Sequence, residues 1–231
     1  MAHFSSKGTR KKFTLFFSLM AMFLVSGCAT ETRQALVVDK VNSASMPYSG
    51  VRSSLVLGKF ENRSSFMRGL FSDGFDRIGS QARTILLSHL QQTHHFNVMD
   101  RDNMSEAKFE ADLGGKSRSV KSAAFLITGD VTEFGRKETG DQQLFGILGR
   151  GKSQVAYAKV TLNVVDALTS EIVFSVQGAG EYALSNREII GFGGTAEYDS
   201  TLNGKVLDLA IKEAVNRLVE GVDQGSWKPK N

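Results

Sequence analysis

The sequence predicts an α+β sandwich, with one mixed sheet, helices packed on it, and two long β-hairpins that extend from it. Three observations support this fold class. Residues 76–93 and 200–224 repeat apolar side chains every three or four positions, the period of a helix with one buried face. Residues 155–164 and 172–182 alternate apolar and polar side chains, the period of a strand. The order strand, helix, strand, helix, several strands and a last helix is typical of such a sandwich.

The first half of the domain is expected to alternate strands and helices. The predicted elements are a strand at 54–60, a helix at 76–93, a strand at 96–99, a helix at 103–113 and a strand at 123–134. Asp76 is a suitable N-cap for the first helix, because a short side-chain oxygen can accept a hydrogen bond from the free amides there. Gly114 and Gly115 end the second helix.

The second half is expected to hold two long strands and a helix. The even-numbered residues from Ala156 to Val164 are apolar, and polar side chains mostly stand between them. The same phase continues from Ile172 to Tyr182, after a polar turn at residues 168–170. Each strand therefore has one apolar face. The last helix follows, and Gly225 is expected to end it.

The chain starts with the features of a secretory signal. Its charged region holds four cations, Lys7, Arg10, Lys11 and Lys12. The apolar residues 13–25 are fewer than the roughly 20 that a membrane-spanning helix needs, so we expect a signal peptide over residues 1–27. Cys28, the single cysteine of the sequence, follows the small residues Ser26 and Gly27. This placement resembles a bacterial lipobox and implies cleavage before Cys28 and lipid on that residue; an uncleaved anchor is the alternative.

A lipid on Cys28 predicts where the mature protein is held. Several acyl chains keep a protein on a membrane where one chain would not. Ala29 and Thr30 stand where an aspartate would favour the inner membrane in lipoprotein sorting. We therefore expect an outer-membrane lipoprotein that faces the periplasm. Residues 28–50 are polar and mixed and are predicted to form a lipidated tether, and residues 51–231 the folded domain.

The charge balance argues against nucleic acid as a partner. The sequence has 28 Lys and Arg against 24 Asp and Glu. Removal of the four leader cations leaves 24 of each sign, so the mature chain carries no formal net charge. No basic excess remains to attract a polyanion. With its cysteine lipidated, the mature chain has no thiol for a disulfide or a cysteine-based metal site.

No segment combines catalytic residues in the context that a catalytic centre needs. Residues 146–153 match the phosphate-binding pattern GxxxxGK[ST], but that loop must precede a helix, and residues 155–164 have the period of a strand. His94 and His95 are adjacent and point in different directions, so a solvated helix end is expected for them. His89 is predicted on the exposed side of its helix. We expect no enzyme, no catalytic residue, no metal and no cofactor besides the covalent lipid.

Two segments, residues 134–154 and 178–201, each extend a strand outward and return. Their glycine-aromatic tips include Phe145 and Gly146 in the first and Gly191 and Phe192 in the second. A transmembrane β-strand needs about 9–11 residues. Hairpins pooled from several identical subunits can close a barrel that leaves no sheet edge. The alternative is a pair of arms that pack on a neighbouring subunit or another partner.

Several segments together resemble the CsgG/HfaB family, the curli secretion channel and the holdfast anchor lipoproteins. They are the lipobox, residues 54–63 (SLVLGKFENR), 123–130 (AAFLITGD), 160–166 (VTLNVVD), 169–172 (TSEI) and the final helix with its Gly225-Ser226-Trp227 ending. The resemblance implies a lipid-anchored periplasmic α/β domain and a ring in which each subunit gives two hairpins to one outer-membrane barrel. It implies as partners copies of the same chain, the outer membrane, and an exported polypeptide or other envelope lipoproteins.

The resemblance also implies a channel constriction in the loop between the first strand and the first helix, residues 61–76. Leu70, Phe71, Gly74 and Phe75 are placed there. A second interpretation of the bulky apolar residues of this loop, which are Phe66, Leu70, Phe71 and Phe75, is that they fold back onto the core. The leading hypothesis is an export channel or assembly component for curli-like surface polypeptides. The alternative is a periplasmic binding module without a pore that docks on an envelope partner, as related lipoprotein activators of cell-wall synthases do.

Overall fold

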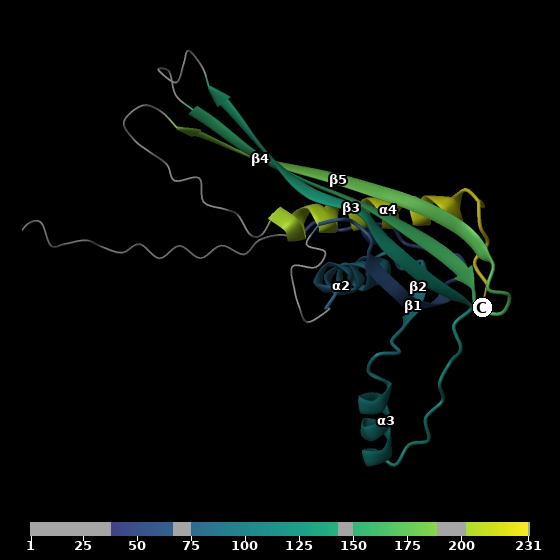
Figure 1. Ribbon diagram of the computed structural model, residues 1–231. Helices are drawn as coiled ribbons and strands as arrows, with labels where there is room; N and C mark the ends of the chain where they lie inside the picture. Colours follow the sequence, from purple (N-terminus) through teal and green to yellow (C-terminus); the bar gives the residue numbers. More distant parts are fainter. Residues whose placement is uncertain (1–37, 67–74, 143–149, 189–201, 231) are drawn as a thin grey trace, which may run out of the picture. The chain divides into compact units, whose positions relative to one another are not determined.

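One five-stranded sheet organises the described part of the chain, with two long helices on one of its faces (Figure 1). The computed structural model describes residues 38–66, 75–142, 150–188 and 202–230. The elements in chain order are η1 (Asn42–Ser45), β1 (Ser53–Asn62), α2 (Arg77–Gln92), β2 (Phe96–Met99), α3 (Met104–Leu113), β3 (Phe125–Gln142), β4 (Arg150–Asp166), β5 (Ile172–Glu188) and α4 (Leu202–Asp223). The α+β class with a mixed sheet is confirmed.

The strand order is β2-β1-β3-β4-β5. β1 runs parallel to both β2 and β3, whereas β3, β4 and β5 are antiparallel neighbours. The pairing of β1 with β3 reaches Val131, and β3 continues to Gln142 beside β4. The strands of the first expected hairpin are therefore paired, and its tip, residues 143–149, lies outside the described residues. β5 continues to Glu188, and residues 189–201 of the second expected hairpin also lie outside them.

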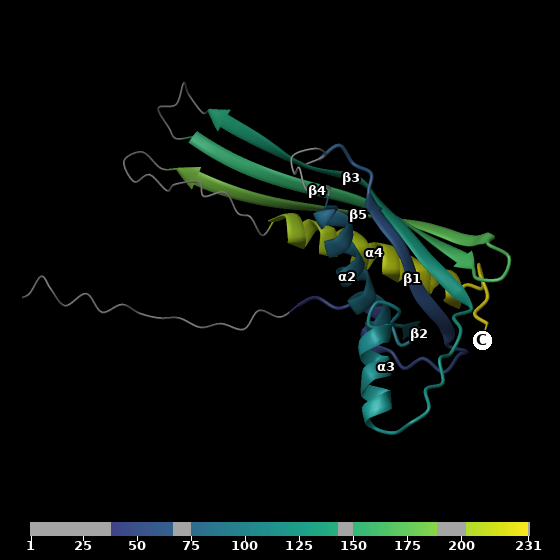
Figure 2. The same ribbon diagram turned by 60° about the horizontal axis from the view of Figure 1, so that its bottom comes forward.

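The core lies between the sheet and the pair α2 and α4, which pack against each other (Figure 2). The predicted apolar stripe of α2 is buried, from Ile78 to Leu90. The even-numbered residues of β4 from Ala156 to Val164 are buried too, as their alternation predicts. In β5 the predicted alternation of buried and exposed residues fails near both ends of the alternating stretch, where Ile172 and Tyr182 are exposed. Burial of these apolar faces is the main force that stabilises the sheet with α2 and α4.

Caps set the ends of the helices where the sequence predicts them. Asp76 Oδ1 accepts a hydrogen bond from Gly79 N at 2.8 Å, at the start of α2. Gly225 has φ +71°, a conformation that glycine adopts without strain. Its amide donates to Val222 O, and Ser226 N donates to Gly221 O at 2.8 Å, which together form a Schellman cap on α4.

Trp227, directly after α4, closes one end of the core. Its ring lies 5.3 Å from that of Phe125, edge to face, and stacks at 6.0 Å from Phe96 and 6.2 Å from Phe174. Its indole donates a hydrogen bond to Leu218 O at 3.4 Å. The residue thus joins the ends of β2, β3, β5 and α4 in one aromatic cluster.

The tether predicted over residues 28–50 ends earlier than expected. Val41 and Ser43 are buried, and Asn42 N donates a hydrogen bond to Asn216 Oδ1 on α4 at 3.0 Å. Lys212 of α4 forms an ion pair with Asp39 at 3.0 Å. The apolar side chain of Val41 is the physical reason, because it finds a place in the core beside α4. Residues 39–46 therefore belong to the folded domain.

Candidate functional site

β3, β4 and β5 continue as a three-stranded ribbon, whose base is covered by the first turns of α4 and whose outer part extends past the start of that helix (Figure 1). We call residues 133–142, 150–159 and 179–188 the ribbon. Ten residues of strand span about 33 Å. Within the described part of the chain, no strand pairs with the outer edge of β3 beyond Val131, and none pairs with the outer edge of β5. Within the described residues, both outer edges of the ribbon are therefore open to pairing with another strand.

Two glycines of β5 let α4 lie directly on the sheet where the ribbon begins. A Cβ on Gly178 would stand 2.1 Å from Ala210 O and 2.4 Å from Ala214 N, both backbone atoms of α4. A Cβ on Gly180 would stand 3.0 Å from Ala210 N. These close approaches explain why the apolar phase of β5 passes through two glycines. They fix the direction of α4 relative to the three strands.

The first turns of α4 are tied to the base of the ribbon by polar contacts. Arg136 Nε on β3 donates a hydrogen bond to Asn203 Oδ1 at 2.8 Å. The Lys205 ammonium lies 5.3 Å above the ring centroid of Tyr182 on β5. Across the ribbon itself, Lys159 Nζ lies 3.4 Å from Glu133 Oε1. Beyond these residues the strands continue past the start of α4 (Figure 1).

The loop proposed for the constriction begins at the end of β1 and ends at the start of α2, and these two points lie side by side. Asp76 Oδ2 accepts a hydrogen bond from Asn62 N at 2.7 Å, so the residue that caps α2 also holds the end of β1. Asn62 Nδ2 donates to Phe66 O at 3.3 Å. The Phe66 ring packs edge to face on Phe134 at 5.0 Å. Both ends of the loop are therefore anchored beside the residue of β3 where the ribbon starts.

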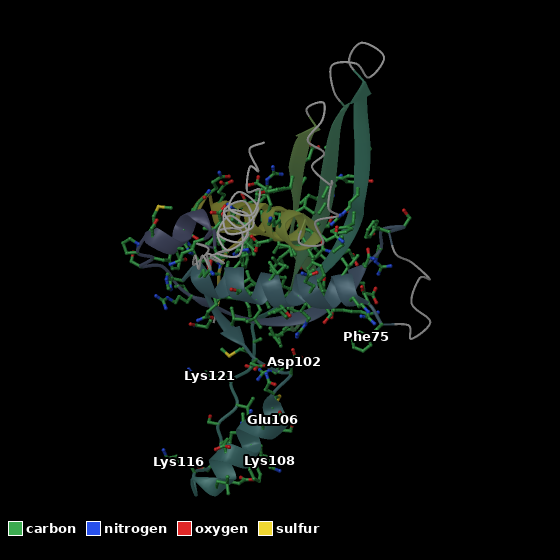
Figure 3. All side chains as sticks on the ribbon, turned by 90° about the vertical axis from the view of Figure 1, so that its left-hand side faces the viewer. Phe75, Asp102, Glu106, Lys108, Lys116 and Lys121 are labelled. Carbon is green, nitrogen blue, oxygen red and sulfur yellow. The ribbon has the colours of Figure 1, made fainter. Side chains whose placement is uncertain are left out.

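The structure describes two phenylalanines of this loop, Phe66 and Phe75, and their environments differ. Phe66 folds back on the core, as described above. Phe75 is 69% exposed and lies at the exit of the loop, away from the sheet (Figure 3). The other predicted constriction residues, Leu70, Phe71 and Gly74, lie outside the described residues, as do Cys28 and the tip residues Phe145, Gly146, Gly191 and Phe192.

The predictions for two of the three domain histidines are wrong. His89 is only 2% exposed, and its Nε2 donates to Asp208 Oδ1 on α4 at 2.8 Å. His95 is buried too; its Nδ1 donates to Thr93 O at 2.6 Å, and its ring stacks on Tyr48 with centroids 3.9 Å apart. Partners on distant parts of the sequence make these polar rings acceptable inside the core. His94, with φ +59°, is exposed at the helix end as expected.

Geometry removes the phosphate-binding interpretation of residues 146–153. β4 begins at Arg150, so the Gly-Lys-Ser part of the pattern lies in a strand and no helix N-terminus follows it. Among the described residues, no three His, Cys, Asp or Glu side chains are grouped so that they could hold a metal ion. In the same part of the chain, no helix is both long enough and apolar enough to cross a membrane.

Comparison with known proteins gives the family of the chain. The family model of the curli production assembly/transport component CsgG matches residues 35–231. A protein of Neisseria meningitidis serogroup B, named as a candidate lipoprotein, is 64% identical over 205 residues, which cover 89% of this chain and 92% of that protein.

Solved structures resemble the fold more distantly. The PelC dodecamer from Paraburkholderia phytofirmans is 14% identical with a TM-score of 0.37, and the match covers 74% of this chain and 92% of that chain. A homologue of the neuraminyllactose-binding hemagglutinin from Helicobacter pylori is 11% identical with a TM-score of 0.43, over 82% and 92% of the two chains.

Proposed function

This chain belongs to the CsgG family, and on that premise we propose that it is a lipid-anchored envelope protein that assembles into a ring at the outer membrane. The ring would serve the export or assembly of a surface polypeptide of the curli type, without catalysis. The observation that carries the proposal is the ribbon with its two open edges. The proposed export substrate follows from the family alone.

Open edges favour a ring for a physical reason. An exposed strand edge readily pairs with another strand, and soluble proteins usually cover or shorten such edges. Here the two edges belong to different strands, β3 and β5, on opposite sides of one ribbon. Joining the β5 side of the ribbon of one copy to the β3 side of the ribbon of the next is a head-to-tail contact, and repetition of a head-to-tail contact closes a ring when the rotation allows it. Each copy would then have both edges satisfied.

The anchor is proposed from the sequence and its relative. Cys28 stands behind a signal peptide, and the Neisseria meningitidis relative is itself named as a candidate lipoprotein. Residues 39–46 are held on α4, so only the residues between Cys28 and Asp39 remain as the tether. Such a short link would keep the domain close to the membrane surface.

The loop of residues 61–76 is the proposed constriction of the ring. Its two ends are anchored at the base of the ribbon, where a channel through a ring of ribbons would begin. Phe75 is exposed there, and Leu70, Phe71 and Gly74 belong to the same loop. The tips with Phe145, Gly146, Gly191 and Phe192 are proposed to lie at the far ends of the hairpins.

Electron microscopy and planar-bilayer recording of the lipidated protein in mild detergent test this function. We expect detergent-stable rings and discrete conductance steps. Replacing Phe75 by Ala should raise the conductance, because a large exposed side chain leaves the narrow loop; Leu168→Ala at the β4–β5 turn is the matched control. A monomer without conductance would overturn the proposal. An unchanged conductance in Phe75→Ala would remove that residue from the constriction.

One observation favours a second function, a periplasmic docking module without a pore. Residues 136–142 of β3 read Arg-Lys-Glu-Thr-Gly-Asp-Gln, so neither set of alternate positions is apolar. A strand that faces lipid needs one apolar set, and a charge at mid-bilayer costs roughly 2–4 kcal/mol. This second function would be supported, and the channel excluded, by rings that conduct no ions and that bind vesicles through the lipid anchor alone.

A further inference from the structure

α3 stands apart from the rest of the domain as an arm (Figures 1 and 3). None of its residues is buried, and no other described helix or strand packs extensively against it. Asp102 and Lys121 lie at its base, and Glu106, Lys108 and Lys116 lie progressively farther from the sheet (Figure 3). A helix of ten residues is too short to be stable alone in water, where about 12–15 residues are marginal.

Local contacts hold the arm in place. The guanidinium of Arg83 on α2 donates two hydrogen bonds to the carboxylate of Asp102, and Nη2 lies 3.1 Å from Oδ1. Arg101 donates to Lys121 O at 2.5 Å and so joins the two chain segments at the base. At the far end Gly115, with φ +61°, and Lys116 N, which donates to Ala111 O at 3.0 Å, complete a Schellman cap. The helix is thus formed and oriented before any partner binds it, which reduces the entropic cost of docking.

The arm exposes an apolar ridge with acidic neighbours. Phe109 is 62% exposed and Leu113 is 68% exposed, and their spacing of four places them on one side of the helix. Glu106 and Glu110 precede them by three residues each and form the next ridge. With Asp112 and the single cation Lys108, the ten residues of α3 carry two net negative charges. A surface that fits this ridge is apolar with a basic rim.

On the sheet face opposite α2, the same chain has a groove in which two apolar side chains and one cation lie among polar neighbours. The groove, of about 810 Å³, lies beside the edge strand β2. Of the described residues that line it, Met99 and Val120 are apolar, Lys121 is a cation, and Ser54, Asn97 and Ser122 are polar. Parallel strands are normally covered on both faces, whereas the parallel set β2-β1-β3 is covered by a helix on one face only within the described residues.

We propose that the arm of one copy docks in this groove of a neighbouring copy, with Phe109 and Leu113 against Met99 and Val120. Lys121 of the receiving copy then faces the acidic ridge of the arm. Lys121, which lines the groove, lies at the base of the chain's own arm, whereas Lys108 and Lys116 lie at its far part (Figure 3), so the proposed occupant is a second copy. The contact is head-to-tail, because each copy offers one arm and one groove. The inference rests on the proposed ring and identifies a contact that holds it together away from the ribbons.

The test uses the full lipidated chain in mild detergent. The double variant Phe109→Ser, Leu113→Ser is compared with Leu168→Ser, which alters an equally apolar, 90% exposed side chain at the β4–β5 turn. Dissociation of the oligomer on dilution is followed by mass photometry. We expect the double variant to dissociate at about 100-fold higher concentration, since each buried anchor of an interface typically contributes a tenfold change or more. The control should follow the wild type.

Cross-linking identifies which surfaces meet. Copies with Leu113→Cys are mixed with differently tagged copies with Val120→Cys and oxidised. A disulfide between the two tags is expected, and none when Leu168→Cys replaces Leu113→Cys. In a separate variant that carries both Leu113→Cys and Val120→Cys, a disulfide formed only within one chain would overturn the proposal, because the arm would then occupy its own groove.

The outcomes separate this inference from the proposed function. A wild-type oligomer that dissociates identically in the double variant overturns the arm contact and leaves the ring standing. A wild-type monomer overturns the ring and the arm contact with it. Both variants expose their substituted side chains in the folded monomer, so their thermal unfolding should match the wild type and exclude misfolding as the cause.

Discussion

The part of the sheet under α4 and the outer part of the ribbon, past the start of α4, are built from the same three strands but from different residues. Under α4, alternate residues of β4 such as Val160 and Leu162 are completely buried, and Trp227 closes the end of the core. In the ribbon, residues 136–142 of β3 contain no apolar side chain. The covered half is stabilised by burial within the chain. The outer part of the ribbon has few apolar side chains to bury within the chain, so its sequence is free to serve contacts outside the chain.

Replacing Trp227 by Ala should give the largest loss in the covered half. Its ring contacts Phe96, Phe125 and Phe174 and is only 4% exposed. Removing such a side chain typically costs about 3–5 kcal/mol. Phe109→Ala on the exposed arm is the control and should change the free energy of unfolding by about 0.5 kcal/mol or less. Urea unfolding measures both, and equal losses would contradict the division between covered and uncovered regions.

Gly178→Ala should give the next largest effect, at the line where the covered half meets the ribbon. The new Cβ would stand 2.1 Å from Ala210 O, and a backbone atom in a helix can move only with its helix. Overpacking of this kind costs about 1–3 kcal/mol in the free energy of unfolding. Gly180→Ala is the matched control, because its nearest atom lies at 3.0 Å and a smaller shift suffices. If the two variants lose the same stability, the close approach at Gly178 is not what positions α4.

The sequence predicts the covered half well because local rules and burial coincide there. Asp76 and Gly225 cap helices where their residue types suggest. The alternation of β4 from Ala156 to Val164 matches its burial. Each of these signals is contained in a few neighbouring residues, so a short stretch of sequence is enough to report it.

Two histidines of the covered half are misplaced by the same local rules. Asp208, the hydrogen-bond partner of His89, and Tyr48, on which the His95 ring stacks, are each more than 40 residues away in sequence from their histidine. No short-range pattern reports such pairs. The available signal for His89 is its position three residues after the buried Leu86, a spacing that keeps it on the core-facing side of α2.

The candidate site is predicted less completely, for the same reason. The open strand edges at β3 and β5 follow from the order of the strands in the sheet. Local sequence patterns predict the strands but not which strands are neighbours. The arm is predicted as a polar helix, but its separation from the core is not. The weak apolar periodicity of residues 104–113 is the signal for it, because a helix without a buried stripe has no reason to pack on the sheet.

Acid should weaken the covered half through Asp166, at the end of β4. A hydrogen bond from Lys230, and then one from the Leu168 amide, lower the pKa of this carboxyl below its ordinary value of 3.8. The unfolded chain therefore binds more protons between the two pKa values, so the stabilisation is present above about pH 4 and is lost as the pH falls below it. The difference in unfolding free energy between wild type and Asp166→Asn should shrink over that range. A constant difference from about pH 5 to about pH 2.5 would contradict the assignment.

The smallest effect is expected in the ribbon itself, from the ion pair of Lys159 and Glu133. Nζ and Oε1 lie 3.4 Å apart, and both side chains are at least one-third exposed. Exposed pairs of this kind contribute about 0.2–1 kcal/mol, and salt screens them. A double-mutant cycle with Lys159→Ala and Glu133→Ala should give a coupling energy within that range at low salt and near zero at about 1 M salt. A larger, salt-insensitive coupling would mean that the ribbon is stabilised from within the chain, and the contrast with the covered half would fail.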